Sequence, residues 1–137
     1  MNAKTIIAGI VTGVVVFILG FVIVMLLLGS YYDQNTMHYP GFAKASADYL
    51  FLAVSCLAYG LLLAYIFALG NIADAKKGFM AALIIGLLVQ INFDTYIYAQ
   101  FNLWGRKLIA IDVVLNGIVS GIVGAFLGWW NGRKSAA

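Results

Sequence analysis

Four long apolar stretches divide this chain, and they constrain its fold more than any other feature. They cover residues 5–28, 46–69, 79–103 and 108–130, with only short polar segments between them. Because the hydrocarbon core of a bilayer is about 30 Å thick, a helix of roughly 20 apolar residues crosses it once. The sequence therefore predicts an all-α integral membrane protein with one domain, an antiparallel bundle of four transmembrane helices.

Composition supports this class of protein and argues against others. The 137 residues are 64% hydrophobic and 9% charged, and their mean hydropathy of +1.01 lies far outside the range of soluble domains. The formal net charge of +3 comes from basic residues near the ends of the apolar stretches, not from a basic face. We therefore expect the lipid bilayer as the main partner and no nucleic acid.

Polar segments set the expected helix ends. Residues 30–44 form the longest of them, and we expect this connector to lie outside the membrane. The second span is expected to begin at Ser46 as its N-cap, with Asp48 in the first turn, and to stop at Gly70 and Asn71.

Basic residues are divided unequally between the two ends of the expected bundle. The end that carries both termini has five of them and the other end has three: Lys4, Lys76, Lys77, Arg133 and Lys134 against Lys44, Arg106 and Lys107. Cytoplasmic ends of membrane helices carry an excess of Lys and Arg. We therefore expect both termini in the cytoplasm.

Small residues recur at close spacing in the first and fourth spans. The segment "GIVTGVVVFILGF" (9–21) aligns without gaps with "GIVSGIVGAFLGW" (117–129). In lipid, small residues let helix backbones approach each other closely. We therefore expect helix packing at six glycines: Gly9, Gly13, Gly117, Gly121, Gly124 and Gly128. In the fourth span, the four-residue row that includes Gly124 and Gly128 starts at Asp112, Asn116 and Ser120.

Polar side chains also recur within the third span. Gln90, Asp94 and Tyr98 are four residues apart and share one side of the helix. Counting a rise of about 1.5 Å per residue from the expected helix ends places Asp94 level with Asn116, and Tyr98 level with Asp112. The short turn between the third and fourth spans makes them neighbours. The sequence therefore predicts one polar cluster between these spans.

The chemistry of this cluster has two interpretations. Its candidate members are Asp94, Asp112, Asn116, Tyr98, Gln90 and, from the second span, Ser55. A carboxylate at membrane depth has to pair, reach water or take up a proton, so two of them can hold one proton or one cation. The other interpretation is a hydrogen-bonded plug, in which protonated Asp94 and Asn116 donate across the helix interface.

No motif indicates enzyme chemistry. Cys56 lies within an apolar stretch, and we expect a buried, inert thiol. His38 lies in the connector without companions for a metal site, so we expect it to be solvated. The sequence offers neither a nucleophile with its base nor a glycine loop that would hold phosphate. We expect no enzyme activity, no metal and no cofactor.

Two segments carry a family resemblance, "FDTYIYAQFNL" (93–103) and "IDVVLNGIVSGIVGAFLGWW" (111–130). The residues that carry it are Phe93, Asp94, Tyr98 and Asn102 in the first segment and Asp112, Gly128 and Trp129 in the second. Through them the chain resembles a family of small, uncharacterised four-helix proteins of the bacterial inner membrane. The resemblance implies a multi-pass protein of the bacterial cytoplasmic membrane, and it implies no activity.

Three functions stay open. The sequence favours a non-enzymatic structural or accessory protein that packs through its glycine ridges, in a homo-oligomer or in a larger membrane complex. The alternative is a minimal proton- or cation-linked transporter or channel that uses Asp94 and Asp112. The third is the binding of a lipid or another amphiphile in a pocket lined by tyrosines, namely Tyr59, Tyr65, Tyr96 and Tyr98.

Overall fold

Helices make up most of the computed structural model, which describes residues 2–44 and 46–135. They are α1 (Ala3–Gly20), η1 (Phe21–Leu27), α2 (Gly29–Asn35), α3 (Tyr49–Leu69), α4 (Ala75–Gln100) and α5 (Arg106–Ser135). By length and composition, four helical segments can cross a membrane: Ala3–Leu27, Tyr49–Leu69, Ala75–Gln100 and Arg106–Arg133. The predicted all-α bundle of four spans is confirmed.

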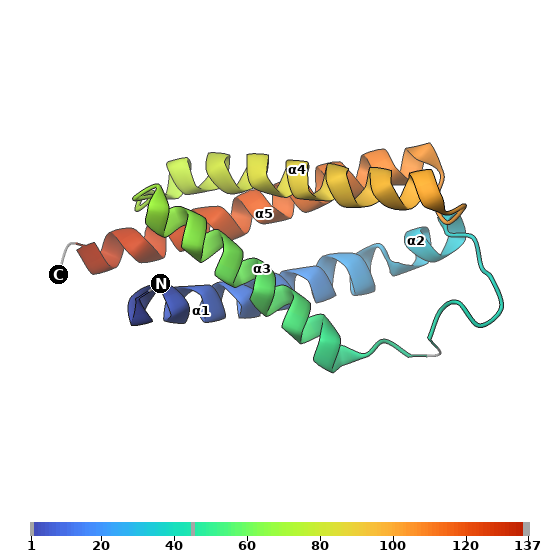
Figure 1. Ribbon diagram of the computed structural model, residues 1–137, viewed down its shortest axis with the longest axis horizontal. Coiled ribbons are helices and arrows are strands. Elements are labelled where there is room, and N and C mark those ends of the chain that lie inside the picture. The colour runs from blue at the N-terminus through green and yellow to red at the C-terminus, as the bar shows by residue number, and fades with distance from the viewer. Residues whose placement is uncertain (1, 45, 136–137) are drawn as a thin grey trace.

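The spans form two tightly packed pairs. α4 packs along α5, α1 packs against α3, and contacts between α1 and α5 join the two pairs. Both termini lie at one end of the bundle with the α3–α4 turn, whereas α2 and the α4–α5 loop lie at the other end (Figure 1). Consecutive spans therefore run antiparallel. α3 crosses the other helices obliquely (Figure 1).

Glycines bring α1 and α3 into backbone contact. A Cβ added at Gly60 would meet backbone atoms of Gly9 and Gly13. A Cβ at Gly13 would lie 2.8 Å from the Cα of Leu57, and one at Gly9 would lie 2.7 Å from Cδ2 of Leu61. These glycines therefore allow a crossing that no larger residue would permit.

The interface between α4 and α5 consists of two facing rows of small residues. On α4 and α5 respectively, the rows are Gly78, Ala82 and Gly86, and Ser120, Gly124 and Gly128. A Cβ at Gly124 would meet the Cβ of Ala82 and the carbonyl group of Gly78, so the two backbones touch there. Gly117 and Gly121 lie beside this contact, under the side chains of Leu87 and Phe79. The row on α5 was visible in the sequence, whereas its partner row on α4 was not recognised.

The N-terminus of α3 differs from the expected one. Asp48 is the N-cap, and its side chain accepts a hydrogen bond from the backbone N–H of Phe51. Ser46 lies two residues before this cap, so its assignment as N-cap was wrong. The other end agrees with the sequence, because α3 stops at Gly70 and Asn71 has a positive φ of 50°.

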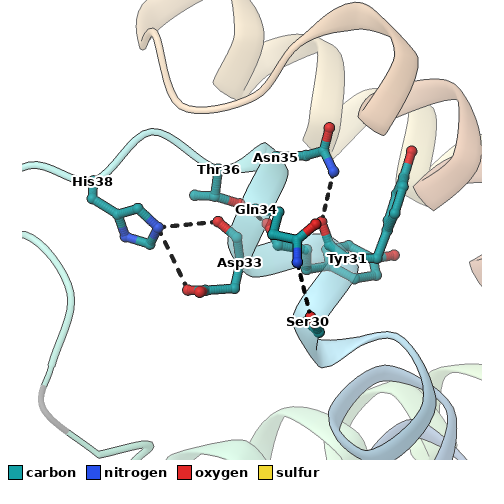
Figure 2. A network of polar contacts seen from close by, with 8 residues as sticks. Ser30, Tyr31, Asp33, Gln34, Asn35, Thr36 and His38 are labelled. Atoms are coloured by element: carbon teal, nitrogen blue, oxygen red, sulfur yellow. Dashed lines mark hydrogen bonds and ion pairs between the residues drawn. The ribbon is translucent and has the colours of Figure 1, made fainter.

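The first helical segment extends further than expected. It changes to a π-helix in η1, where the N–H of Leu28 donates to the carbonyl of Ile23, and then continues as α2. The first part of the predicted connector 30–44 is therefore helical. Side chains along α2 form hydrogen bonds between residues four apart. In Figure 2, the amide of Gln34 donates to the hydroxyl of Ser30, and the amide of Asn35 donates to the carbonyl of Tyr31.

Candidate functional site

Four polar side chains meet where α2, α4 and α5 come together, and we call them the acid cluster: Tyr32, Gln90, Asp94 and Asp112. The amide nitrogen of Gln90 donates to Oδ1 of Asp94 at 2.8 Å and to Oδ2 of Asp112 at 2.5 Å. The hydroxyl of Tyr32 donates to Oδ1 of Asp112. Hydrogen bonds therefore connect all four side chains.

Asp94 has an incomplete set of hydrogen bonds. Its relative exposure is 0%, and its Oδ2 receives no hydrogen bond from a donor in the described part of the chain. The carboxyl group of Asp112 lies beside it, because one nitrogen of Gln90 donates to both carboxyl groups. Ionised carboxylates are acceptors only, so neither of these neighbours can donate a hydrogen to the other.

No basic side chain neutralises this cluster within residues 2–44 and 46–133. The ion pairs there join His38 to Asp33 and Lys44 to Asp48, and all four of these side chains are more than a third exposed. Exposed pairs of this kind contribute little to stability. Asp94 and Asp112 therefore meet without the counter-charge that buried carboxylates usually have.

The spacing of residues on α4 explains how Gln90 and Asp94 reach Asp112. Both continue the four-residue row that begins at Gly78, and Asp112 continues the facing row on α5. Small residues hold the helices together along one half of these rows. In the other half, the longer polar side chains fill the space between the helices, and the acid cluster lies there.

Tyr32 reaches Asp112 because the segment after α2 is attached to the α4–α5 loop. The N–H of Met37 donates to the carbonyl of Leu103 at 2.8 Å, and Thr36 forms an isolated antiparallel bridge with Trp104. Burial and, to a smaller extent, the hydrogen bond to Asp112 raise the pKa of Tyr32 well above its ordinary value. The hydroxyl therefore keeps its proton and acts as a donor.

A cavity of about 350 Å³, which we call the helix cavity, lies among α1, α3, α4 and α5. Its polar wall includes Gln90, Asn116 and Ser120, and the hydroxyl of Tyr59 lies 2.8 Å from Oγ of Ser120. Neither aspartate of the acid cluster is part of the lining. Gln90 lines the cavity and also bonds to the two carboxylates. It therefore lies between the cavity and the carboxylate pair.

Some predicted members of the polar cluster lie elsewhere. The hydroxyl of Tyr98 accepts a hydrogen bond from Nε of Arg106, and Asn116 donates to the carbonyl of Asp112 on its own helix. Ser55 lines the helix cavity with Gln90 and Asn116. The sequence placed Asp94 level with Asn116, and Tyr98 level with Asp112. Neither pair forms a hydrogen bond in the described part of the chain.

The helix ends explain this change of register. α4 ends at Gln100 instead of residue 103, and α5 begins at Arg106 instead of residue 108. Both shifts move the turn toward lower residue numbers. Each position on α4 therefore faces a position on α5 with a lower number than the sequence predicted, which brings Asp94 and Asp112 to the same nitrogen of Gln90.

The other candidates also have definite places. Of the four predicted pocket tyrosines, Tyr59 lines the helix cavity, whereas Tyr65, Tyr96 and Tyr98 are exposed and lie outside its lining. Cys56 is half-buried and lines the same cavity, so its thiol is not sealed in the core.

His38 is exposed and turns back toward Asp33, at 3.0 Å from its carbonyl and 3.5 Å from its carboxylate (Figure 2). In the described part of the chain, no group of three or more potential metal ligands is close enough to hold an ion.

Sequence reasoning missed Tyr32 as a member of the site. Tyr32 follows the first apolar stretch directly and was assigned to the connector. A helical continuation of the first span would have been the only signal, because Tyr32 and Asp112 are 80 residues apart. No protein-family model, curated protein or solved structure matches this chain. Functional interpretation therefore depends on the geometry of the acid cluster and the helix cavity.

Proposed function

We propose that this protein is a minimal proton- or cation-linked membrane transporter or channel that takes up one positive charge at Asp94 and Asp112. One observation carries the proposal: Gln90 donates to both carboxylates, while the fully buried Oδ2 of Asp94 receives no hydrogen bond from any described donor. Intramembrane carboxylates of this kind mark proton and ion pathways.

The physical reason is the cost of two neighbouring negative charges in an apolar environment. Taking one ion out of water costs several kcal/mol, and like charges in contact add to that cost. One proton placed between the carboxyl groups supplies the missing donor and removes one charge. A monovalent cation at the same place balances one charge without donating a hydrogen bond.

The hydrogen-bonded plug fits these contacts less well. That interpretation needs Asn116 to bond across the interface, but its amide donates to a carbonyl of its own helix. Gln90 supplies a donor for Oδ1 of Asp94 and leaves Oδ2 without one. The Asp94 part of the plug therefore needs the same proton that we propose the pair takes up, and its Asn116 part does not form.

The glycines give little support to the accessory interpretation. Each of the six predicted packing glycines lies against another helix of the same chain: Gly9, Gly13, Gly117, Gly121, Gly124 and Gly128. Close contacts within the chain already use these surfaces. An interface with a second protein would therefore need other residues.

The proposed environment is the bacterial inner membrane, with both termini in the cytoplasm. The resemblance to small bacterial membrane proteins supports the compartment, and the excess of Lys and Arg near the termini supports the orientation. In this orientation, α2 and Tyr32 lie toward the non-cytoplasmic side, from which the acid cluster would exchange its charge.

The test compares wild type with Asp94→Asn, and with Asp33→Asn as a matched control at an exposed carboxylate. Purified protein in liposomes is given a proton or sodium gradient, and the flux is followed with an internal indicator. In parallel, infrared spectra follow the carboxyl band during titration. Wild type and Asp33→Asn should show both signals, and Asp94→Asn should lose them. Equal signals in all three proteins would overturn the proposal.

A further inference from the structure

We infer that the helix cavity is a binding site for an organic ammonium ion, whose charge is balanced by the two carboxylates behind Gln90. This inference rests on the proposed function, because it uses the same negative charge. It adds the chemical class of the ligand and the place where the ligand lies.

The cavity has the size and position of a ligand site. Its volume of about 350 Å³ lies within the range of roughly 300–1,000 Å³ that is usual for small-molecule pockets. Four helices contribute to its wall. Such sites between the helices of a bundle commonly combine an apolar lining with a few polar groups, as this lining does through Val119, Val123 and Gln90.

Hydrogen bonds orient two amides of the lining. The nitrogen of Gln90 is directed to the two carboxylates, and the nitrogen of Asn116 donates to the carbonyl of Asp112. The side-chain carbonyl oxygens of both residues therefore remain as acceptors. An ammonium group is a donor without acceptors of its own, so it matches this wall.

Charge and aromatic rings select among ligands. The lining contains no Lys, Arg or His, and the acid cluster begins directly behind Gln90. An anion would therefore be repelled. Tyr59 and Phe93 also line the cavity, and aromatic rings attract organic cations through their faces. A neutral alcohol carries no charge, so it would gain neither the attraction to the carboxylates nor the attraction to the aromatic rings.

Cys56 provides a native probe of this site, because it is the single cysteine of the chain and lines the cavity. The purified full chain in mild detergent is reacted with N-ethylmaleimide, and mass spectrometry follows the rate of modification. Hexylammonium is added as the probe, with hexanol and hexanoate as controls of equal chain length. At ten times its dissociation constant, a bound ligand should slow the reaction about tenfold.

Protection should be specific to the cation and should depend on Asp94. Hexylammonium should protect Cys56 in wild type and in Asp33→Asn, and should lose most of its effect in Asp94→Asn. Equal protection by hexanol would identify a site for apolar chains and overturn the inference. A Cys56 that does not react at all would contradict a cavity open to ligands.

The two proposals can fail separately. If hexylammonium protects wild type and Asp94→Asn equally, while Asp94→Asn still loses the flux and the carboxyl signal, the ammonium site is wrong and the proposed function stands. If wild type shows neither flux nor a carboxyl signal, the proposed function fails, and the ammonium site fails with it because its balancing charge is missing.

Discussion

The two halves of the α4–α5 interface have the same four-residue spacing, but one half consists of small residues and the other of long polar side chains. Toward the termini, Gly78 and Ala82 face Gly124, and the backbones touch. Toward the α4–α5 loop, the same rows continue as Gln90 and Asp94 facing Asp112, and side chains fill the space. The first half stabilises the helix pair through close packing, and the second half brings ionisable groups together.

This difference shows how one pair of membrane helices can both pack closely and bring ionisable groups together. Close packing needs only small residues at every fourth position. Once that contact fixes the relative position of the helices, polar residues further along the same rows meet in a defined geometry. The packed half therefore sets the position of the acid cluster, and changes in each half should have separate effects.

The largest effect is expected for Gly124→Leu, which tests whether the packed half holds the helices together. A side chain there would meet Ala82 and the carbonyl of Gly78, so the helices would have to separate. Overpacking should cost about 3 kcal/mol or more, seen as a lower thermal midpoint in one detergent. Gly20→Leu is the control, because a Cβ at Gly20 would meet no heavy atom within 4 Å beyond its own turn of helix. Similar losses in both variants would contradict the comparison.

The next effect concerns Gln90→Leu, which removes the donor shared by the two carboxylates. Leaving buried acceptors unsatisfied should cost about 1–3 kcal/mol. Combining it with Asp94→Leu should cost less than the sum of the single changes, because one of those acceptors is then absent. Strict additivity in thermal or denaturant unfolding would show that Gln90 and Asp94 do not interact.

A smaller effect is expected for Tyr32→Phe. It removes the hydroxyl that donates to Asp112 and should cost about 1.5 kcal/mol. Tyr31→Phe is the matched control, since the Tyr31 hydroxyl makes no hydrogen bond within the described residues, and it should be near neutral. Unfolding of both variants under one set of conditions makes the comparison, and equal stabilities would contradict the role of Tyr32.

The effect of Tyr32 should also depend on pH. Its pKa is raised in the folded protein, mainly by burial, so the folded state holds the phenolic proton more tightly than the unfolded state. This contribution to stability is fully present below the ordinary tyrosine pKa of about 10 and is lost as the pH rises above it. The difference in stability between wild type and Tyr32→Phe should therefore shrink at alkaline pH.

The smallest effect is expected for Asn116→Ala, at the boundary between the two halves. Its amide bonds only to a carbonyl of its own helix, so its loss should cost about 0.5 kcal/mol, the lower end of the range for one hydrogen bond. Gln90→Leu measured in parallel is the reference. A cost for Asn116→Ala as large as that reference would indicate that Asn116 bonds across the interface.

Much of the fold could be predicted because it depends on local composition. Each of the four apolar stretches of 23 to 25 residues is long enough to cross a bilayer and has few other ways to bury its backbone polar groups. Asp94 and Asp112 could be singled out for a related reason, since carboxylates at membrane depth are costly. These inferences require no knowledge of which residues face each other.

The details of the site could not be predicted because they depend on register and on distant contacts. A shift of two or three residues at the ends of α4 and α5 was enough to replace the pair Asp94 and Asn116 by Asp94 and Asp112. Tyr32 was missed for another reason: its position depends on the attachment of Met37 to Leu103, which leaves no local pattern. The row Gly78, Ala82 and Gly86 was not recognised, because only its contact with α5 distinguishes it from other small residues of the span.

The hydrogen bond from Tyr32 to Asp112 has a consequence for biogenesis. During translation, Tyr32 leaves the ribosome 80 residues before Asp112, and α3 and α4 are made in between. Asp94 and Gln90 thus enter the bilayer before Asp112, their partner on α5, has been made. The site becomes complete only when the last helix inserts, so a chain interrupted before α5 would leave Asp94 in the bilayer without the helix that packs along α4 and covers it.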